Sequence, residues 1–489
     1  MQKGTLHSDG YSPYQAIDEP RFYECDRYGD VRLSNRLLAL KERVLDRKSV
    51  VIQQLADKLS EREAWYRLLK HPKLRIGKML SDLLESSCGW EESSHLLLLE
   101  DTTQLTYNHL RDKLVDPSGL GGTYAYNSRY YGYLMHLTIG IDAVADFPVG
   151  IADVQYWHKA AGMEGYDQRK GASLPIEKKS SYRWISAALA GAKRIGPSIA
   201  KTVIADRESD IYEAFCQWQA AGLDFIVRSQ FDRKITASAG KLRAYLDQMP
   251  AKGEYELSIE SDKRSGQTSR MARMELRFGP ITLERGYKAK SSRIQDYPKE
   301  LDLYVLEAKE ISLTTKPIVW RLLSSHPIDS VQAAKQVLEW YQKRWHIEQF
   351  FRILKNKGLQ LETLKYEQGL SILRMGTIAL EAAFRILQLN LAMKSETELP
   401  ITRFFSIRQK AILLLLSRRY EGNTPKSKNP YPHTNLKWAG WTIARMGGWK
   451  GYNTQARPGP ITFARGWAQF KQAEQTLELL NLEIDMEEG

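Results

Sequence analysis

Three acidic residues lie in sequence contexts that suit the binding of a divalent metal ion. Asp101 follows four leucines in LLLLED, and Asp206 ends the apolar run TVIAD. Each pattern predicts an acid at the end of a buried strand, where it could be a metal ligand or, more simply, a turn former or helix cap. Glu348 is the single acid in WYQKRWHIEQFFRILKNKG, among aromatic and basic residues. Three carboxylates that converge could hold one or two Mg²⁺ ions.

The stretch around Glu348 carries other polar residues at helical spacing. An ideal helix advances about 100° per residue and would place five side chains on one stripe: Tyr341, Arg344, Glu348, Arg352 and Lys355. A plain surface stripe accounts for part of this pattern, with each ion pair contributing only about 0.2–0.5 kcal/mol. An acid that binds a metal beside cations that bind phosphate also accounts for the tyrosine and for the excess of positive charge.

The overall charge favours a polyanionic partner. Lysine and arginine number 71 against 58 aspartate and glutamate residues, which gives a formal net charge of +13. Nucleic acid is the first candidate partner and an anionic membrane surface the second. The basic residues are spread along the chain instead of forming one amphipathic helix, which disfavours the membrane. No run of about 18 apolar residues is present, so no membrane span is expected.

Cysteine and histidine give no metal-binding pattern. Cys25, Cys88 and Cys216 lack CxxC spacing, and their odd number predicts neither a zinc site nor a disulfide framework. His136 and His346 are isolated from other ligand-type residues, so a core or surface role is expected for both. The first 15 residues lack the apolar segment of a signal peptide. We therefore expect a reducing, cytoplasmic location.

A chain of 489 residues is long enough for several domains. Residues 1–90 are predicted to be helical and basic, and residues 91–375 alternate strands and helices as in an α/β sheet domain. Alternating apolar residues predict a β-rich insertion at about 230–319. Residues 376–489 are predicted to form a C-terminal helical domain.

Two helices are expected in the N-terminal region. The first would begin after Asp30 as N-cap, with one apolar side formed by Leu33, Leu37, Leu38 and Val44. The second would begin at the capping-box pattern that starts with Ser60. The basic residues of these helices fit a solvated face or a DNA-contacting face equally well.

The sequence motifs around the three acids resemble those of a known family. Asp101 in EDTTQLTY, Asp206 in ADRESDI and the spacing Tyr-x2-Arg-x3-Glu-x6-Lys from Tyr341 onward are similar to the DDE transposases of the insertion-sequence-four family. The last run matches that family's Tyr-Arg-Glu-Lys signature in full. Arg228 in DFIVRS and Trp320 in WRLLSSHP lie in segments that resemble its cut-and-paste members, and the C-terminal WAGWTIARMGGWKG resembles their dimerisation region.

The resemblance implies a fold and a reaction. The fold would be ribonuclease-H-like, with the β-rich insertion between the second Asp and the Glu. Asp101 would bridge two Mg²⁺ ions, for which Mn²⁺ can substitute, and Asp206 and Glu348 would each support one. Paired metals can activate water or a 3′-hydroxyl and stabilise the leaving oxygen. The implied reaction is cut-and-paste transposition: a nick at the transposon end, hairpin formation, hairpin hydrolysis, and insertion into target DNA.

The resemblance also implies which residues contact double-stranded DNA. Trp320 would stack on a base flipped out at the bent hairpin, a contact worth about 1–3 kcal/mol; without the resemblance, a core role would be preferred for this residue. Phosphates would be held by five residues, with the last two the weaker candidates: Tyr341, Arg344, Lys355, Arg228 and Arg352. Arginine suits bidentate phosphate contacts and lysine a point-charge contact.

Recognition of DNA ends and pairing of subunits are assigned to the two ends of the chain. Helices within residues 19–75 would recognise the terminal inverted repeats, with Arg32 and Arg36 as first candidates. The C-terminal region would form a homodimer that holds two ends in a synaptic complex, in a bacterial, nucleoid-associated protein. Residues 1–18 have no clear counterpart in the family, and Arg352 stands where relatives often carry lysine.

Two other functions fit the same residues. A metal-dependent nuclease of the same fold would cut DNA without joining it; Trp320 and the extended signature favour transposition instead. A repressor descended from a transposase would bind DNA without catalysis and would be recognised by the loss of a triad acid. Asp101, Asp206 and Glu348 are all present.

Overall fold

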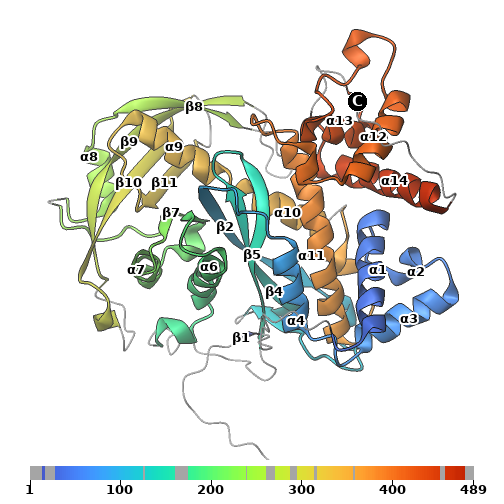
Figure 1. Ribbon diagram of the computed structural model, residues 1–489. Helices are drawn as coiled ribbons and strands as arrows, with labels where there is room; N and C mark the ends of the chain where they lie inside the picture. Colours follow the sequence, from blue (N-terminus) through green and yellow to red (C-terminus); the bar gives the residue numbers. More distant parts are fainter. Residues whose placement is uncertain are drawn as a thin grey trace, which may run out of the picture.

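The computed structural model describes residues 14–16, 28–124, 127–159, 174–237, 239–259, 270–286, 294–312, 317–355, 358–451 and 457–479. Within these residues, the centre of the molecule is an 11-stranded sheet in the order β1-β5-β3-β4-β2-β6-β7-β11-β10-β9-β8 (Figure 1). The strands are β1 (Tyr14–Ala16), β2 (His95–Thr106), β3 (Gly121–Tyr124), β4 (Asn127–Asp142), β5 (Phe147–Lys159), β6 (Ala200–Ala205), β7 (Asp224–Arg228), β8 (Gly253–Ile259), β9 (Arg270–Glu284), β10 (Glu300–Glu310) and β11 (Val319–Ser324).

Helices precede, cover and follow this sheet. They are α1 (Val31–Arg47), α2 (Ile52–Leu55), α3 (Leu59–Lys70), α4 (Ile76–Ser86), α6 (Tyr182–Ile195), α7 (Tyr212–Ala220), α8 (Leu242–Gln248), α9 (Val331–Gln342), α10 (Trp345–Lys355), α11 (Gly369–Ala392), α12 (Ile407–Tyr420), α13 (Leu436–Met446) and α14 (Pro460–Leu479). The mixed sheet with flanking helices is consistent with the ribonuclease-H-like fold that the resemblance implies.

The strands that position the acids lie at the centre of the sheet. β2 pairs antiparallel with β4, which pairs antiparallel with β5, and β6 and β7 continue the sheet from β2 in parallel. The leucines from Leu96 to Leu99 are fully buried because both α6 and α10 pack against β2. Successive side chains of a strand point to opposite faces, so the even-numbered residues of β2 face α6 and the odd-numbered residues face α10.

The β-rich insertion extends the central sheet. β8, β9 and β10 form an antiparallel meander. β11 pairs antiparallel with β10 on one side and with β7 on the other, and so joins the meander to the rest of the sheet (Figure 1). The described part of residues 230–319 contains the strands β8, β9 and β10 and also α8. A single continuous sheet thus connects the insertion to the strands that carry the acids.

The first helix of the chain follows the sequence pattern with one exception. α1 begins after Asp30, whose side chain accepts hydrogen bonds from the N–H groups of Arg32 and Leu33. The prediction that Leu38 belongs to the apolar side is wrong, because its side chain is 57% exposed and Leu40 is fully buried. The apolar stripe of a helix advances in steps of three or four residues. The residue that follows Leu37 on this stripe is therefore Leu40 and not Leu38.

The start of α3 also differs from the prediction. α3 begins at Leu59, after Lys58, so Ser60 is already inside the helix and makes no capping hydrogen bond. The acid that organises this end is instead Glu61, which accepts a 2.8 Å bond from the N–H of Asp57.

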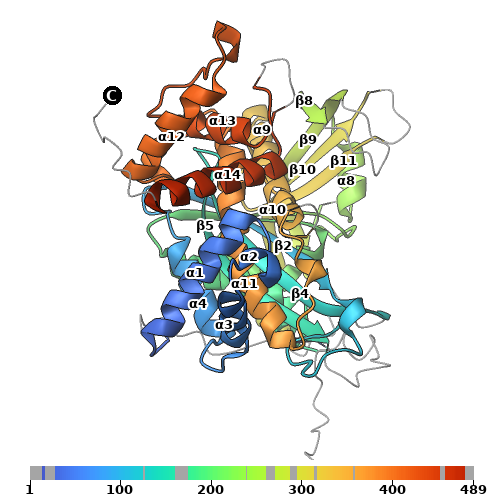
Figure 2. The same ribbon diagram turned by 90° about the vertical axis from the view of Figure 1, so that its right-hand side faces the viewer.

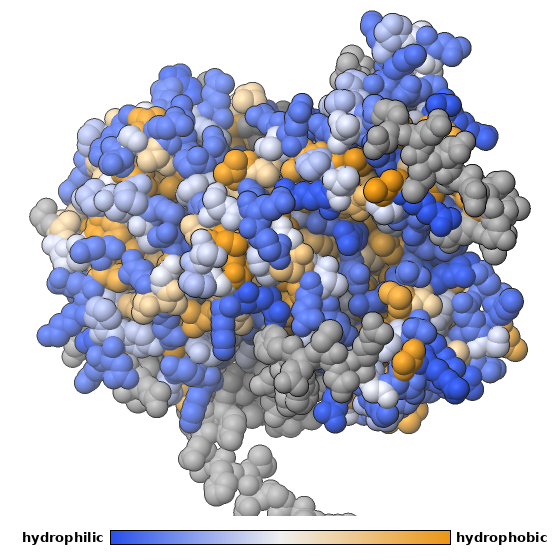
Figure 3. Space-filling view, viewed as in Figure 1, coloured by the Kyte–Doolittle hydropathy of each residue, from blue (hydrophilic) through white to orange (hydrophobic). Residues whose placement is uncertain are grey.

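The C-terminal helices pack closely on the long buried helix α11. α14 contacts α11, α13 and α1, so the helices α1 and α14 meet beside α11 (Figure 2). α13 and α14 approach so closely that a Cβ atom on Gly466 would lie 1.7 Å from the carbonyl oxygen of Ile443. No helix among the described residues is long and apolar enough to cross a membrane. The face in Figure 3 is largely hydrophilic, with hydrophobic residues in small separate patches.

Candidate functional site

Asp101, on β2, lies next to Asp206, the residue directly after the adjacent strand β6. β2 and β6 pair in parallel, with Leu99 opposite Ile204. Two residues further along the chain come Asp101, still on β2, and Asp206, just past the end of β6, and the alternation of side chains puts both on the same face. The prediction that Asp101 ends its strand is wrong, because β2 continues beyond it by pairing with β4. Since the pairing with β6 stops at Leu99, Asp101 still lies past the end of the parallel pair.

The single helix predicted over residues 341–355 is also wrong, because α9 and α10 meet at a corner. At this corner the N–H groups of Lys343 and Arg344 bond to carbonyl oxygens three residues back, as in a 3₁₀ turn. Lys343 and His346 then contact Asp146, in the turn between β4 and β5, at 2.8 and 3.4 Å. The corner is thereby anchored to the sheet, and the polar side chains come from two helices and the turn at Lys343 and Arg344 that separates them.

Arg344, at this corner, bridges two of the three acids. Its Nη1 atom donates to Oδ2 of Asp101 at 3.2 Å, and its Nη2 atom donates to Oε1 of Glu348. The Arg344 side chain is only 13% exposed, which strengthens these charge-assisted bonds relative to bonds in open water. Asp101 also accepts a 2.8 Å bond from the N–H of Thr102.

The third acid, Asp206, is contacted by Tyr341. The Tyr341 hydroxyl donates to Oδ1 of Asp206 at 3.4 Å, and its ring meets the ring of Trp320 edge-on, with centroids 5.7 Å apart. Trp320 lies on β11, where Arg228 of the adjacent strand β7 donates to the carbonyl of Val319 at 3.4 Å. Trp320 and Arg228 are far apart in the sequence, yet both lie next to Tyr341: Trp320 by ring contact, and Arg228 close enough for its charge to act on the Tyr341 hydroxyl.

Burial and mutual repulsion shape the ionisation of this cluster. Burial raises the pKa of Asp101 to about 6, against the lowering effect of Arg344, and the charges of Glu348 and Asp206 raise it further. Burial also raises the pKa of Glu348, again opposed by Arg344. The pKa of Tyr341 rises to about 12, mainly through burial and then through the charge of Asp206. Nearby carboxylates that resist joint ionisation are well suited to gain a cation.

Residues 188–380 match the family model of the transposase DDE domain. The match covers less than half of the 489 residues. It contains Asp206, Glu348 and the residues of the α9–α10 corner, and it begins after Asp101. The match supports a DDE transposase family and suggests transposase activity. A domain of this kind implies a DNA substrate and the use of divalent metal ions.

The three acids have the donor chemistry that such a domain needs. Carboxylate oxygens are the ligands that Mg²⁺ prefers, and Asp101 and Glu348 lie within reach of one guanidinium group. Among the described residues, no three His, Cys, Asp or Glu side chains are grouped as metal ligands. Arg344 instead bonds to oxygens that a cation would use. The residues therefore fit a divalent metal by type and location, with Arg344 as the cation that neutralises two of them.

The other predicted DNA contacts lie outside this cluster. Lys355 is half-buried at the end of α10, where burial lowers its pKa against the charge of Glu362. Arg352 is exposed on the same helix. Arg32 and Arg36 are exposed on α1, in the group of helices that packs on α11.

Several residues near the site gave no signal in the sequence. Arg183 of α6 donates to the Thr102 hydroxyl at 3.0 Å and to Glu208 at 2.7 Å, and Asp146 anchors the helix corner. These contacts join segments far apart in the chain, so spacing could not reveal them. His136, predicted to be a core or surface residue, is fully buried and lies 2.9 Å from the Thr102 hydroxyl.

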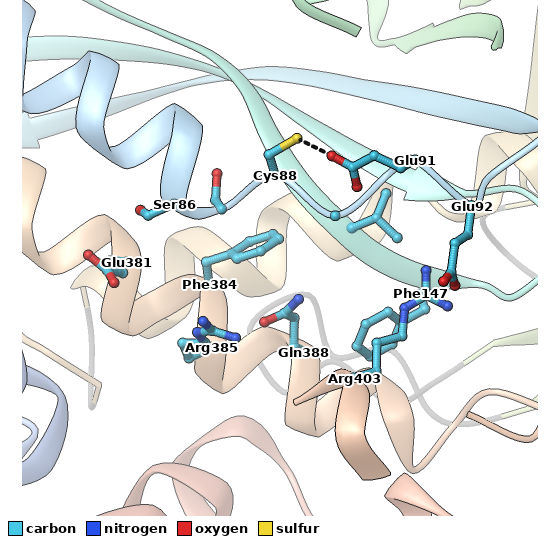
Figure 4. A pocket seen from close by; sticks show the side chains of 13 residues that line it. Ser86, Cys88, Glu91, Glu92, Phe147, Glu381, Phe384, Arg385, Gln388 and Arg403 are labelled. Carbon is cyan, nitrogen blue, oxygen red and sulfur yellow. Dashed lines mark hydrogen bonds between the residues drawn. The ribbon is translucent and has the colours of Figure 1, made fainter. Parts of the chain in front are cut away.

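A cavity lies apart from this site. It has a volume of about 340 Å³ between the end of α4, the start of β5 and α11 (Figure 4). Its lining includes Cys88, Gln388 and the arginines Arg385 and Arg403, and none of the predicted catalytic or DNA-binding residues. It therefore adds nothing to the chemistry of the acids.

Proposed function

We propose that this protein is a cut-and-paste DNA transposase, of the insertion-sequence-four type, that cuts transposon ends and joins them to target DNA by phosphoryl transfer. The observation that carries the proposal is the convergence of Asp101 from β2, Asp206 from the turn after β6 and Glu348 from α10 on one face of the sheet. Their shared neighbours are Tyr341 and Arg344. The match to a transposase DDE domain supports the same function.

In this proposal the three acids hold two divalent metals, Mg²⁺ or Mn²⁺. Bound metals would activate the attacking water or 3′-hydroxyl and stabilise the leaving oxygen. Asp101 is the central ligand because it lies on β2 between the segments that carry the other two acids. Its raised pKa means that metal binding and proton loss are coupled at this residue.

The surrounding residues hold the DNA end. Trp320 is half-buried beside Tyr341, which bonds to Asp206, a place from which its ring can stack on a base that leaves the helix. Tyr341, Arg344 and Lys355 bind adjacent phosphates, with Arg228 and Arg352 in supporting positions. This arrangement favours a hairpin intermediate, since a flipped base relieves the sharp bend of a hairpin.

The helical regions at either end of the chain have separate tasks in this proposal. Residues 1–90 bind the terminal inverted repeats, with exposed Arg32 and Arg36 of α1 as contacts. Residues 376–489 form a homodimer that brings two ends into one synaptic complex. The catalytic domain, residues 91–375, then acts on DNA of the bacterial nucleoid.

An end-cleavage and strand-transfer assay tests the function. Wild type, Glu348→Ala and Glu339→Ala would be incubated with the element's terminal DNA, a target plasmid and Mg²⁺; Glu339 is an exposed acid on α9 and serves as the control. Wild type and the control should give nicks, hairpins and joined products, and Glu348→Ala should bind the ends without cutting them. Cutting without joining by wild type would instead identify a nuclease, and binding without cutting would identify a repressor.

A further inference from the structure

Arg183 links the segment of β2 that carries Asp101 to the turn that follows Asp206. From the start of α6, its Nε atom donates to the hydroxyl of Thr102 at 3.0 Å, and its Nη2 atom donates to Glu208 at 2.7 Å. Thr102 directly follows Asp101, and Glu208 lies two residues after Asp206. A third bond, from Nη1 to the carbonyl of Ser180 at 2.8 Å, fixes the guanidinium to its own segment.

These contacts act through the groups that hold each aspartate. The N–H of Thr102 donates to Oδ1 of Asp101 at 2.8 Å, so the position of Thr102 sets the orientation of that carboxylate. Glu208 lies in the 3₁₀ turn of Arg207–Ser209, and the N–H and hydroxyl of Ser209 both donate to the main-chain oxygen of Asp206. Movement of this turn therefore moves Asp206.

The guanidinium group of Arg183 is well suited to hold such a junction. Its planar fork of donors fixes direction as well as distance, and its side chain is only 11% exposed. It lies on the α6 face of the sheet, with Thr102, whereas Asp101 points to the opposite face. Arg183 thus contacts the supports of both acids, Thr102 and Glu208.

We infer that Arg183 is a positioning residue that sets the spacing of the Asp101 and Asp206 carboxylates for a divalent metal pair. The inference rests on the proposed function, because it concerns metal binding at that same site. Outer-shell partners of this kind typically change metal affinity by about 10- to 100-fold when they are removed.

The sign of the effect separates positioning from simple electrostatics. A cation near a metal site repels the metal. If Arg183 acted only through its charge, its removal would therefore tighten metal binding. Loss of positioning weakens it. Arg183→Met removes the fork and keeps the apolar stem, Arg183→Lys keeps the charge without the fork, and Lys193→Met removes an exposed cation from the same helix as a control.

Binding of Mn²⁺ to the full-length protein provides a readout independent of cleavage. It is measured as the loss of the electron paramagnetic resonance signal of free Mn²⁺. We expect Arg183→Met to raise the dissociation constant for Mn²⁺ about 10-fold, Arg183→Lys to raise it less, and Lys193→Met to leave it unchanged. The Mn²⁺ concentration for half-maximal end cleavage should rise in parallel. Unchanged or tighter binding by Arg183→Met would overturn the inference.

Two milder variants keep the test valid if Arg183→Met fails to fold. Thr102→Val removes the acceptor with little change of shape, and Glu208→Gln removes the ion pair at an exposed side chain. Weaker Mn²⁺ binding by both supports the inference, and wild-type binding by both contradicts it. If wild type itself neither binds Mn²⁺ nor cuts DNA, the proposed function fails, and the inference with it.

Discussion

Asp101 and Glu348 bind the same guanidinium group, that of Arg344, although one lies on β2 and the other on α10. Arg344 can take this position because the chain turns a corner between α9 and α10 directly before it reaches the second acid. Without a metal, the arginine supplies the positive charge that lets these carboxylates lie close together. The bond between Arg344 and the acids is therefore expected to weaken as a metal binds.

Replacement of Arg344 should make the protein depend on metal for stability. Arg344→Met leaves partly buried carboxylates without their counter-charge, a change that should lower the free energy of unfolding by about 1–3 kcal/mol at neutral pH with chelator present. Mg²⁺ should then raise the melting temperature of the variant more than that of wild type. Arg352→Met, which removes an exposed cation from the adjacent helix α10, should change stability by no more than about 0.5 kcal/mol. An equal effect of Mg²⁺ on both proteins would contradict this role.

The raised pKa of Asp101 predicts a pH-dependent difference in stability. An aspartate titrates near 3.9 in an unfolded chain and here near 6, so the folded protein binds this proton more tightly. The resulting stabilisation is present below about pH 4 and is lost as the pH rises through about 6. The side chain introduced in the variant Asp101→Asn does not titrate. The free energy of unfolding of this variant, relative to that of wild type, should therefore rise by about 2 kcal/mol from pH 4 to pH 7.5.

Urea unfolding with chelator at both pH values measures this difference. Subtraction of the two proteins cancels the titration of the shared groups that do not interact with Asp101. A gap between the variant and wild type that stays constant from pH 4 to 7.5 would show that Asp101 has an ordinary pKa.

Trp320 should matter at one step of end processing. Trp320→Ala should slow hairpin formation by the equivalent of about 1–3 kcal/mol, because it removes the ring on which a flipped base would stack. The first nick should be less affected, since it precedes the bend. Trp320→Phe keeps a stacking face and should retain most of the activity. Quenched time courses on a denaturing gel resolve the two steps; equal slowing of nick and hairpin would point to a structural role instead.

Arg32 and Arg36 should contribute to the recognition of DNA ends through phosphate contacts. Arg32→Gln with Arg36→Gln should weaken end binding and reduce the dependence of log K on log salt by roughly 0.9 for each lost contact. Arg243→Gln, an exposed arginine on α8 in the insertion, should leave binding unchanged. Fluorescence anisotropy at several salt concentrations measures both quantities, and an unaltered salt dependence would exclude phosphate contacts by these residues.

The close approach of α13 and α14 predicts a sensitive position in the C-terminal helices. A Cβ atom on Gly466 would lie 1.7 Å from the carbonyl oxygen of Ile443 and 3.0 Å from the nitrogen of Gly447, which are backbone atoms that cannot move alone. Gly466→Ala should therefore destabilise the protein by about 1–3 kcal/mol or more. Gly459→Ala has open space around it and is the control. Equal melting temperatures for the two variants would show that the helices are not packed this closely.

Much of the local structure follows from the sequence alone. The apolar run before Asp101 and the run before Asp206 predict two buried strands, because only strands enclosed on both faces tolerate such continuous apolar sequence. The N-cap at Asp30 and the strand-rich insertion are equally local features. The candidate acids could be chosen because residue type and strand context are both visible in the chain.

Other features depended on tertiary contacts. The corner between α9 and α10 is anchored by Asp146 on a distant turn. Helical periodicity contains no information about this contact, and it therefore predicted one continuous stripe. β2 extends past Asp101 because β4 supplies a pairing partner. Leu38 is exposed because the buried side of α1 is narrower than the predicted one.

The sequence by itself determined which residues could bind a metal and phosphate. Only the tertiary structure decided that these residues meet, since parallel pairing of β2 with β6 sets Asp101 beside Asp206. It also decided that Arg344 lies between Asp101 and Glu348 and that Arg183 links β2 to the turn that follows Asp206. Such relationships arise from long-range packing, which no spacing along the chain encodes.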